Sequence, residues 1–227
     1  MAIDIDTSRI EELSALAVPA WVRGVWQRTM IRAEGAAADR TSTVIWIQTP
    51  TLYADIRVPA EGETSPLAGK AGFAGRLDVE GQVCRWRRPI DLHPGPEGAD
   101  QGAMFRDREL LVEVGLLANY YEEYRLIDPA TRCLAASRGG FAIENGSVRF
   151  APDGPLDILV AAGAFVTHAR RDGTSALRHG RLEDGGVTFD HAVGDPAVFE
   201  GGQGTWTIWT DEIGETERSA LLAATAT

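Results

Sequence analysis

The sequence predicts an all-β protein whose antiparallel strands close into barrels, with a short helix at the N-terminus. From Trp21 onward, runs of about five to ten residues rich in β-branched and aromatic side chains alternate with clusters of Gly, Asp, Pro or Asn. No segment between consecutive runs is long enough for the crossover helix that parallel strands require. Regularly spaced strands of this kind are typical of β-barrels and β-sandwiches.

The N-terminal helix is predicted within residues 1–20. Ser8 is followed three residues later by Glu11, which is the spacing of a capping box, and Leu13 lies among apolar residues at helical spacing. Pro19 ends the run. We expect about two to three turns of helix that act as a plug or lid on the body behind them.

The remaining chain divides into two sets of strands of similar size. A boundary near residues 128–131 separates a first domain, residues 21–130, from a second, residues 131–227. Turn signals such as Asn145-Gly146 and Asp172-Gly173 support hairpins. Strands are expected near residues 24–33, 42–48, 51–58, 71–79, 82–90, 101–106, 109–115, 118–127, 132–137, 140–144, 147–151, 156–162, 164–170, 175–182, 186–192, 204–212 and 216–222.

Composition and charge exclude several classes of protein. The 227 residues include 33 acidic and 22 basic side chains, a formal charge of −11, which disfavours nucleic acid and anionic membrane surfaces as partners. No apolar run approaches the ~18 residues of a membrane span, and the acidic N-terminus does not resemble a signal peptide. Cys84 and Cys133 are far apart, so we expect free thiols and a cytoplasmic location. Whether the chain forms a homodimer is left open.

Several motifs resemble a known family. Gly24-Val25-Trp26 opens the first strand directly after the helix, as in lipocalin and calycin barrels, where the Trp seals the closed end. The series resembles an uncharacterised lipocalin-like family of fungal and bacterial proteins built from two small consecutive barrels. The further motifs are Trp46-Ile47-Gln48, Leu52-Tyr53-Ala54-Asp55-Ile56-Arg57-Val58-Pro59, Gly72-Phe73-Ala74-Gly75, Trp86 and Tyr121-Glu122-Glu123-Tyr124-Arg125-Leu126-Ile127-Asp128-Pro129.

This resemblance covers about residues 21–130 and, more faintly, residues 155–212. It implies two consecutive lipocalin-like barrels, with Trp26 buried near the N-terminal helix against a basic or aromatic neighbour. It implies no reaction and no catalytic residues. The chain departs from true lipocalins in two ways, because it lacks their Thr-Asp-Tyr motif and their secretory signal.

The best candidate site lies on the strand at 52–58, which alternates in character. Tyr53, Asp55 and Arg57 share one face, and Leu52, Ala54 and Ile56 share the other. If the polar face points inward, the Arg57 guanidinium can bind a ligand carboxylate with two hydrogen bonds. The alternative, usual for antiparallel sheets, is that the polar face is solvated. The candidate ligand-binding residues are Trp46, Gln48, Tyr53, Asp55, Arg57, Glu122 and Tyr124.

Other polar clusters have simpler interpretations. Arg85, Arg87 and Arg88 around Trp86 resemble a stacking patch for nucleic acid, but nearby carboxylates favour cross-strand pairing of exposed charges. His179 and Glu183 have the spacing of helical metal ligands, but their segment is predicted as strand and turn, so the two side chains would not converge. The sequence contains no HExxH, CxxC or His-x-His motif and no nucleophile motif, and we predict no catalytic residue and no cofactor. Haem binding through His168 is an alternative, because some small calycin-like barrels bind haem through one histidine.

Three functions follow from this reading. The leading one is a non-enzymatic binding protein that holds a small, partly hydrophobic or carboxylate-bearing ligand in a barrel cavity. The alternatives are a small barrel enzyme of the isomerase or cyclase type, and an interaction protein with a filled core. An apolar cavity with one charged anchor would favour binding, two buried carboxylates would favour catalysis, and no cavity would favour the interaction protein.

Overall fold

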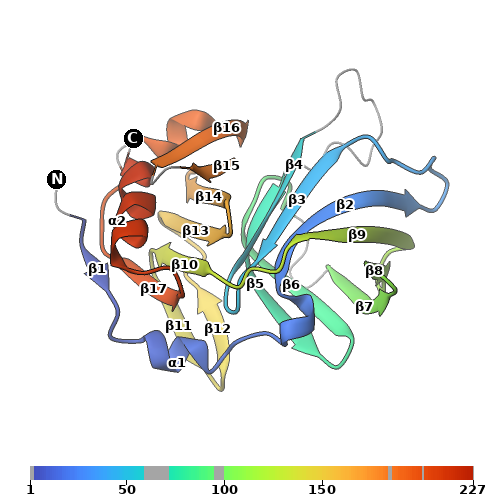
Figure 1. Ribbon diagram of the computed structural model, residues 1–227, viewed down its shortest axis with the longest axis horizontal. Coiled ribbons are helices and arrows are strands. Elements are labelled where there is room, and N and C mark those ends of the chain that lie inside the picture. The colour runs from blue at the N-terminus through green and yellow to red at the C-terminus, as the bar shows by residue number, and fades with distance from the viewer. Residues whose placement is uncertain (1–2, 59–71, 95–99, 184–185, 201, 227) are drawn as a thin grey trace.

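Eight consecutive strands close into an antiparallel barrel in the first half of the chain. The computed structural model describes residues 3–58, 72–94, 100–183, 186–200 and 202–226. The barrel forms one side of the molecule (Figure 1). Each strand pairs with the one before it, and β9 returns to β2. The predicted antiparallel barrel is therefore confirmed. Its strands are β2 (Gly24–Ala33), β3 (Thr43–Gln48), β4 (Tyr53–Val58), β5 (Gly72–Glu80), β6 (Val83–Asp91), β7 (Gln101–Asp107), β8 (Leu110–Gly115) and β9 (Tyr120–Asp128).

The second half forms a seven-stranded sheet, and the described residues show no second closed barrel. The edges of this sheet are β1 and β16, and a separate hairpin, β11–β12, packs beside it. One pair is parallel, since Ile5 of β1 lies opposite Trp206 of β17, which corrects the expectation of purely antiparallel sheets. In order across the sheet, the strands are β1 (Ile5–Asp6), β17 (Trp206–Asp211), β10 (Cys133–Arg138), β13 (Leu156–Ala162), β14 (Phe165–Asp172), β15 (Thr174–Glu183) and β16 (Gly186–Gly194), and the hairpin is β11 (Phe141–Glu144) and β12 (Ser147–Phe150).

Strand β1 of the N-terminal segment joins this second sheet and α1 (Ile10–Ser14) contacts β17, while Val18 and Val22 after the helix pack in the cluster around Trp26 of the barrel. The role of the segment as a plug or lid stays a prediction. Helix α1 is shorter than predicted, and its N-cap is Arg9, which makes no side-chain capping bond. The capping box fails because Asp6 Oδ1 already accepts the backbone N–H of Ser8 at 2.8 Å. The first barrel strand follows a short 3₁₀ turn, η1 (Ala20–Val22). The division of the chain at residues 20 and 130 into domains stays a prediction.

A second helix lies where a strand was predicted. Helix α2 (Glu215–Ala223) replaces the expected strand at 216–222, and it covers the face of the sheet that lies away from the barrel (Figure 1). Its Leu221 and Leu222 are buried against sheet residues that include Leu159 and Trp206. The shorter 3₁₀ segments are η2 (Pro196–Phe199) and η3 (Ala224–Ala226).

The opposite face of the sheet packs against the outside of β3 and β4. A continuous apolar core joins these two strands to β10, β13, β14 and β15. The Thr51 and Thr210 hydroxyls are hydrogen-bonded across the junction at 2.8 Å, and Arg171 Nη1 donates to Pro89 O at 2.7 Å. Strand β4 is therefore buried on both faces, with the barrel interior on one side and the sheet on the other. The core residues at the junction include Ile45, Ile47, Leu52, Ala54 and Ile56 from the barrel and Ala135, Ile158, Val160, Ala169 and Leu177 from the sheet.

One end of the barrel interior is filled by aromatic and aliphatic side chains around Trp26. The Trp26 side chain is fully buried, and its Nε1 donates to Val22 O in η1 at 2.8 Å. Its ring stacks on Trp46 with a centroid distance of 6.2 Å, and the Arg106 guanidinium lies 4.4 Å from its centroid. The expectation of a buried Trp26 against a basic or aromatic neighbour is confirmed.

Candidate functional site

The barrel encloses a cavity of about 220 Å³ beyond the filled end. Seven of the eight barrel strands contribute lining residues, and Gly102 of the remaining strand, β7, packs against the side chain of Glu113. Ala118 and Asn119, in the turn between β8 and β9, are exposed and place its opening there. The lining residues are Ile31, Ala33, Trp46, Asp55, Arg57, Phe73, Trp86, Arg88, Asp100, Glu113, Ala118, Asn119, Tyr120, Glu122 and Tyr124.

The polar face of β4 points into this cavity. Asp55 and Arg57 are 3% and 8% exposed, so the alternative of a solvated polar face is wrong. Both faces of the strand are buried because its apolar face meets the second sheet. Arg57 Nε donates to Asp55 Oδ1 at 2.8 Å, which neutralises the guanidinium within the strand. Burial alone would lower the pKa of Arg57, but Asp55 and Glu122 outweigh it and hold that pKa above its usual range.

Five of the seven predicted ligand-binding residues line the cavity, and two lie elsewhere. Gln48 is at the end of β3, where its Nε2 donates to Thr49 O at 2.9 Å. Tyr53 is part of the filled end, with its ring edge-on to Phe73 and its hydroxyl donating to Arg87 O at 3.3 Å. The residues that line the cavity are Trp46, Asp55, Arg57, Glu122 and Tyr124.

The sequence reasoning missed two carboxylates in the lining, Glu113 and Asp100, and one cation, Arg88. Glu113 and Glu122 are direct cross-strand partners on β8 and β9, and both are buried. Arg88 lines the cavity together with Trp86, and it pairs with Asp100. The alternation of β6 is the signal that could have found Arg88, since it shares a strand face with Trp86. The register that brings the two glutamates together was not readable from one sequence.

The outward-facing arginines of β6 behave as expected from cross-strand pairing. Arg87 Nε is 2.9 Å from Asp78 Oδ2, and Arg85 Nη1 is 3.3 Å from Glu80 Oε2. Both guanidiniums are partly solvated. The prediction of exposed charge pairs is confirmed for these two residues, and it is wrong for Arg88, whose face of the strand points inward.

Two tyrosine–glutamate pairs dominate the electrostatics of the cavity. The Tyr124 hydroxyl donates to Glu122 Oε2, and the Tyr120 hydroxyl donates to Glu113 Oε1. Burial, followed by the charge of Glu122, raises the pKa of Tyr124 well above its usual range, so its hydroxyl remains a donor. Glu122 also forms an ion pair with Arg28, at 3.2 Å between Nη1 and Oε1.

Glu113 has no cationic contact among the described residues. Burial, followed by repulsion from Glu122, raises the pKa of Glu113 to about 8, although Tyr120, Arg57 and Arg88 act to lower it. Gly102 packs directly against this side chain, since a Cβ at that position would lie 2.7 Å from Glu113 Oε1. The raised pKa favours the protonated, neutral form of the Glu113 carboxyl group at neutral pH.

We expect Glu113 to make the protein less stable as the pH rises. Its folded-state pKa lies above the unfolded value of about 4.3, so its contribution is complete at low pH and is lost between about pH 4.3 and pH 8. The loss is at most about 1.4 kcal/mol for each pH unit. Urea unfolding across this range should show Glu113→Gln gaining free energy of unfolding relative to the parent as pH rises. The exposed control Glu109→Gln should follow the parent, and parallel profiles for the parent and Glu113→Gln would contradict the assignment.

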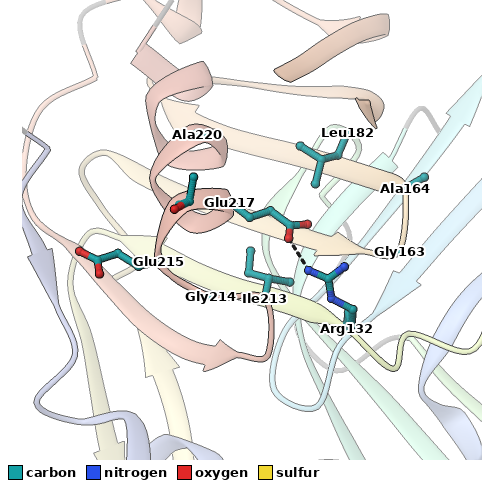
Figure 2. Close-up of a pocket in the computed structure, with 10 residues that line it drawn as sticks. Arg132, Gly163, Ala164, Leu182, Ile213, Gly214, Glu215, Glu217 and Ala220 are labelled. Carbon is teal, nitrogen blue, oxygen red and sulfur yellow. Dashed lines mark hydrogen bonds and ion pairs between the residues drawn. The ribbon is translucent and has the colours of Figure 1, made fainter. Parts of the chain in front are cut away.

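A second and larger depression lies on the surface beside α2. It measures about 630 Å³, and Glu217 of the helix pairs across it with Arg132 at 2.5 Å (Figure 2). Its lining contains no aromatic side chain, and it is wide open to solvent, with the Arg132 side chain 63% exposed. It lacks the enclosure and the convergent buried polar groups of a small-molecule site. The barrel cavity is the better candidate.

His168 is buried in the second sheet, outside the cavity. Its Nε2 is 2.8 Å from Asp157 Oδ1, and its Nδ1 accepts from Arg178 Nε at 3.2 Å. Since both nitrogens are hydrogen-bonded, neither is available to a haem iron. The described residues contain no group of three or more His, Cys, Asp or Glu placed to hold a metal ion. No helix in the described ranges has the length and apolar character needed to cross a bilayer.

Comparison of the chain with protein-family models, curated proteins and solved structures gave no match. The all-β fold with a closed eight-stranded antiparallel barrel is compatible with a lipocalin-like fold. The cavity and its residues are therefore the features that bear on function.

Proposed function

We propose that this protein binds a small molecule with a flat apolar body and a polar head inside the barrel. The observation that carries the proposal is the enclosed cavity, in which aromatic rings and buried polar groups converge. A closed barrel of eight strands leaves room for one small ligand. At about 220 Å³, the cavity is smaller than the ~300–1,000 Å³ typical of drug-sized ligands, which favours a compact one.

The aromatic wall supports an apolar or aromatic ligand body. Trp46, Trp86 and Tyr124 form a cluster, with ring centroids 6.4 Å apart for the two indoles and 5.7 Å for Trp46 and Tyr124. Rings held in this way offer large contact area at little cost in conformational entropy. We also propose that the protein is a member of the lipocalin-like family and is located in the cytoplasm.

Binding is tested with 2-naphthol, a neutral fluorescent aromatic probe. We expect saturable one-to-one binding to the parent and loss of binding in Ala33→Trp, because an indole at this lining position fills the cavity. The matched control Ala220→Trp fills the surface depression beside α2 and should bind as the parent does. Circular dichroism checks that both variants are folded. No saturable binding, or equal loss in both variants, would overturn the proposal.

Acid–base catalysis is a second candidate, favoured by the buried cross-strand carboxylates Glu113 and Glu122. Glu113, protonated at neutral pH, can donate its proton to a carbonyl oxygen, and Glu122 can accept a proton from the neighbouring carbon. The resulting enol returns to ketone by the reverse transfers. Incubation with phenylacetone in deuterated water should then exchange its α-protons faster than the uncatalysed reaction. No acceleration, or unchanged acceleration in Glu122→Gln, would remove this candidate.

A further inference from the structure

We propose that the ligand of the barrel cavity carries a positive charge and that Glu113 is its counter-ion. This inference rests on the proposed binding function and specifies its ligand class: a compact aromatic or apolar amine in its ammonium form. Four observations lead to it: the pattern of ion pairs in the lining, the surplus of carboxylates, the aromatic wall and the surroundings of Glu113.

The first observation is that every lining carboxylate except Glu113 has an arginine in contact. Asp55 is held by Arg57, Asp100 by Arg88, and Glu122 by Arg28 from the wall of β2. Among the described residues, Glu113 receives only the Tyr120 hydroxyl. A buried carboxylate is stable in its charged form only when it is paired, so an incoming cation would complete this site.

The second observation concerns the two lining guanidiniums, which are already neutralised. Arg57 is bonded to Asp55, and Arg88 contacts both Asp91 and Asp100. Four carboxylates and two guanidiniums line the cavity, and both guanidiniums are already paired, so an anionic ligand would find no unpaired cation among the described lining residues. The proposal therefore differs from the sequence-based expectation, in which Arg57 binds a ligand carboxylate.

The third observation is that the aromatic rings already accept cations on their faces. The Arg88 guanidinium lies 3.5 Å from the centroid of Phe73, and that of Arg57 lies 5.0 Å from the same centroid. Trp46, Trp86 and Tyr124 line the remaining wall, and no guanidinium of the described residues lies over their rings. Aromatic faces around a carboxylate are the arrangement that recognises ammonium groups.

The surroundings of Glu113 couple the binding of a cation to the release of the proton from its carboxyl group. The groups that face it are Tyr120 and Glu122 from β9, Arg57 from β4, and Arg88 and Cys84 from β6; Asp100 accepts from the Tyr120 hydroxyl. With a pKa of about 8, Glu113 must release its proton before it can pair with a cation at neutral pH. Affinity for a permanent cation should therefore rise as the pH increases and level off above about pH 8.

The test compares three ligands of similar size: 2-phenylethylammonium, 2-phenylethanol and phenylacetate. Calorimetry at about pH 8 should show the ammonium binding roughly tenfold or more tighter than the alcohol, with phenylacetate weakest. In Glu113→Gln, which preserves the side-chain shape, binding of the alcohol should persist and the preference for the ammonium should disappear. Glu109→Gln, on an exposed carboxylate, should retain the parent preference.

The pH dependence gives an independent readout with phenyltrimethylammonium, whose charge does not titrate. Its affinity should rise roughly fifty-fold between about pH 6 and pH 8. Binding at about pH 6 should release close to one proton for each ligand bound, and Glu113→Gln should abolish both the rise in affinity and the proton release. If phenylethanol binds but no ammonium preference or proton release is seen, the charge inference is overturned and the binding function stands. If none of the ligands binds, both are overturned.

Discussion

Replacing Asp157 by Asn should lower the free energy of unfolding by about 3–5 kcal/mol, because the substitution leaves buried cations without their counter-charge. Asp157 is 1% exposed, and it accepts from Arg138 Nε at 3.0 Å, from Arg170 Nη1 at 3.1 Å and from His168. Burial by itself would raise the pKa of Asp157, but the hydrogen bond from His168 and the hydrogen bond and charge of Arg138 outweigh it and lower that pKa. Urea unfolding at neutral pH measures the loss.

The matched control is Asp172→Asn, which removes another partner of the same Arg170. Asp172 is 3.0 Å from Arg170 Nη2, but its side chain is 46% exposed, so solvent screens the pair. We expect a loss of about 0–1 kcal/mol there. Similar losses in the two variants would show that Asp157 is not the central counter-charge of the second sheet.

Trp26→Ala should also cost about 3–5 kcal/mol, as for other fully buried large aromatics. The substitution removes the stack on Trp46, the hydrogen bond to η1 and the contact with Arg106, and it opens the filled end of the barrel. Trp21→Ala is the control, since Trp21 is only partly buried beside the same cluster. Its replacement should lower the free energy of unfolding clearly less than Trp26→Ala does. A loss below about 1 kcal/mol for Trp26→Ala, measured by urea unfolding, would contradict its role as the seal.

The strands of the barrel could be predicted because their signals are local. Alternation of side-chain character and the Gly and Asp turns mark them, and Trp26 is buried as the Gly-x-Trp pattern indicates. The burial of β4 on both faces was not predictable, since it depends on the second sheet packing on Leu52, Ala54 and Ile56. A single strand pattern shows two different faces but does not say what covers each of them.

The helices were harder to predict than the strands. Asp6 competes for the backbone N–H of Ser8, so the predicted capping box does not form. The C-terminal segment was assigned as a strand although Glu215, Glu217 and the Ala-Leu-Leu-Ala run at 220–223 favour helix by propensity. The local composition of this segment therefore favours helix, unlike that of the strands before it.

The candidate site was half predictable. Glu122 and Tyr124 alternate with outward residues on one strand, so their shared face was readable. Glu113 was not, because only the cross-strand register of β8 and β9 brings it opposite Glu122. The absence of an arginine beside Glu113 in the described chain is likewise a property of the assembled barrel.

The most direct test of the account is to locate the ligand by NMR. Titration with 2-phenylethylammonium should shift the backbone amides of Ala33, Trp86 and Asn119 around the barrel cavity, in a saturable manner. The amides of Gly163, Ala164 and Ala220 around the depression beside α2 should not move (Figure 2). Shifts confined to that depression, or no saturable shifts at all, would contradict a ligand site inside the barrel.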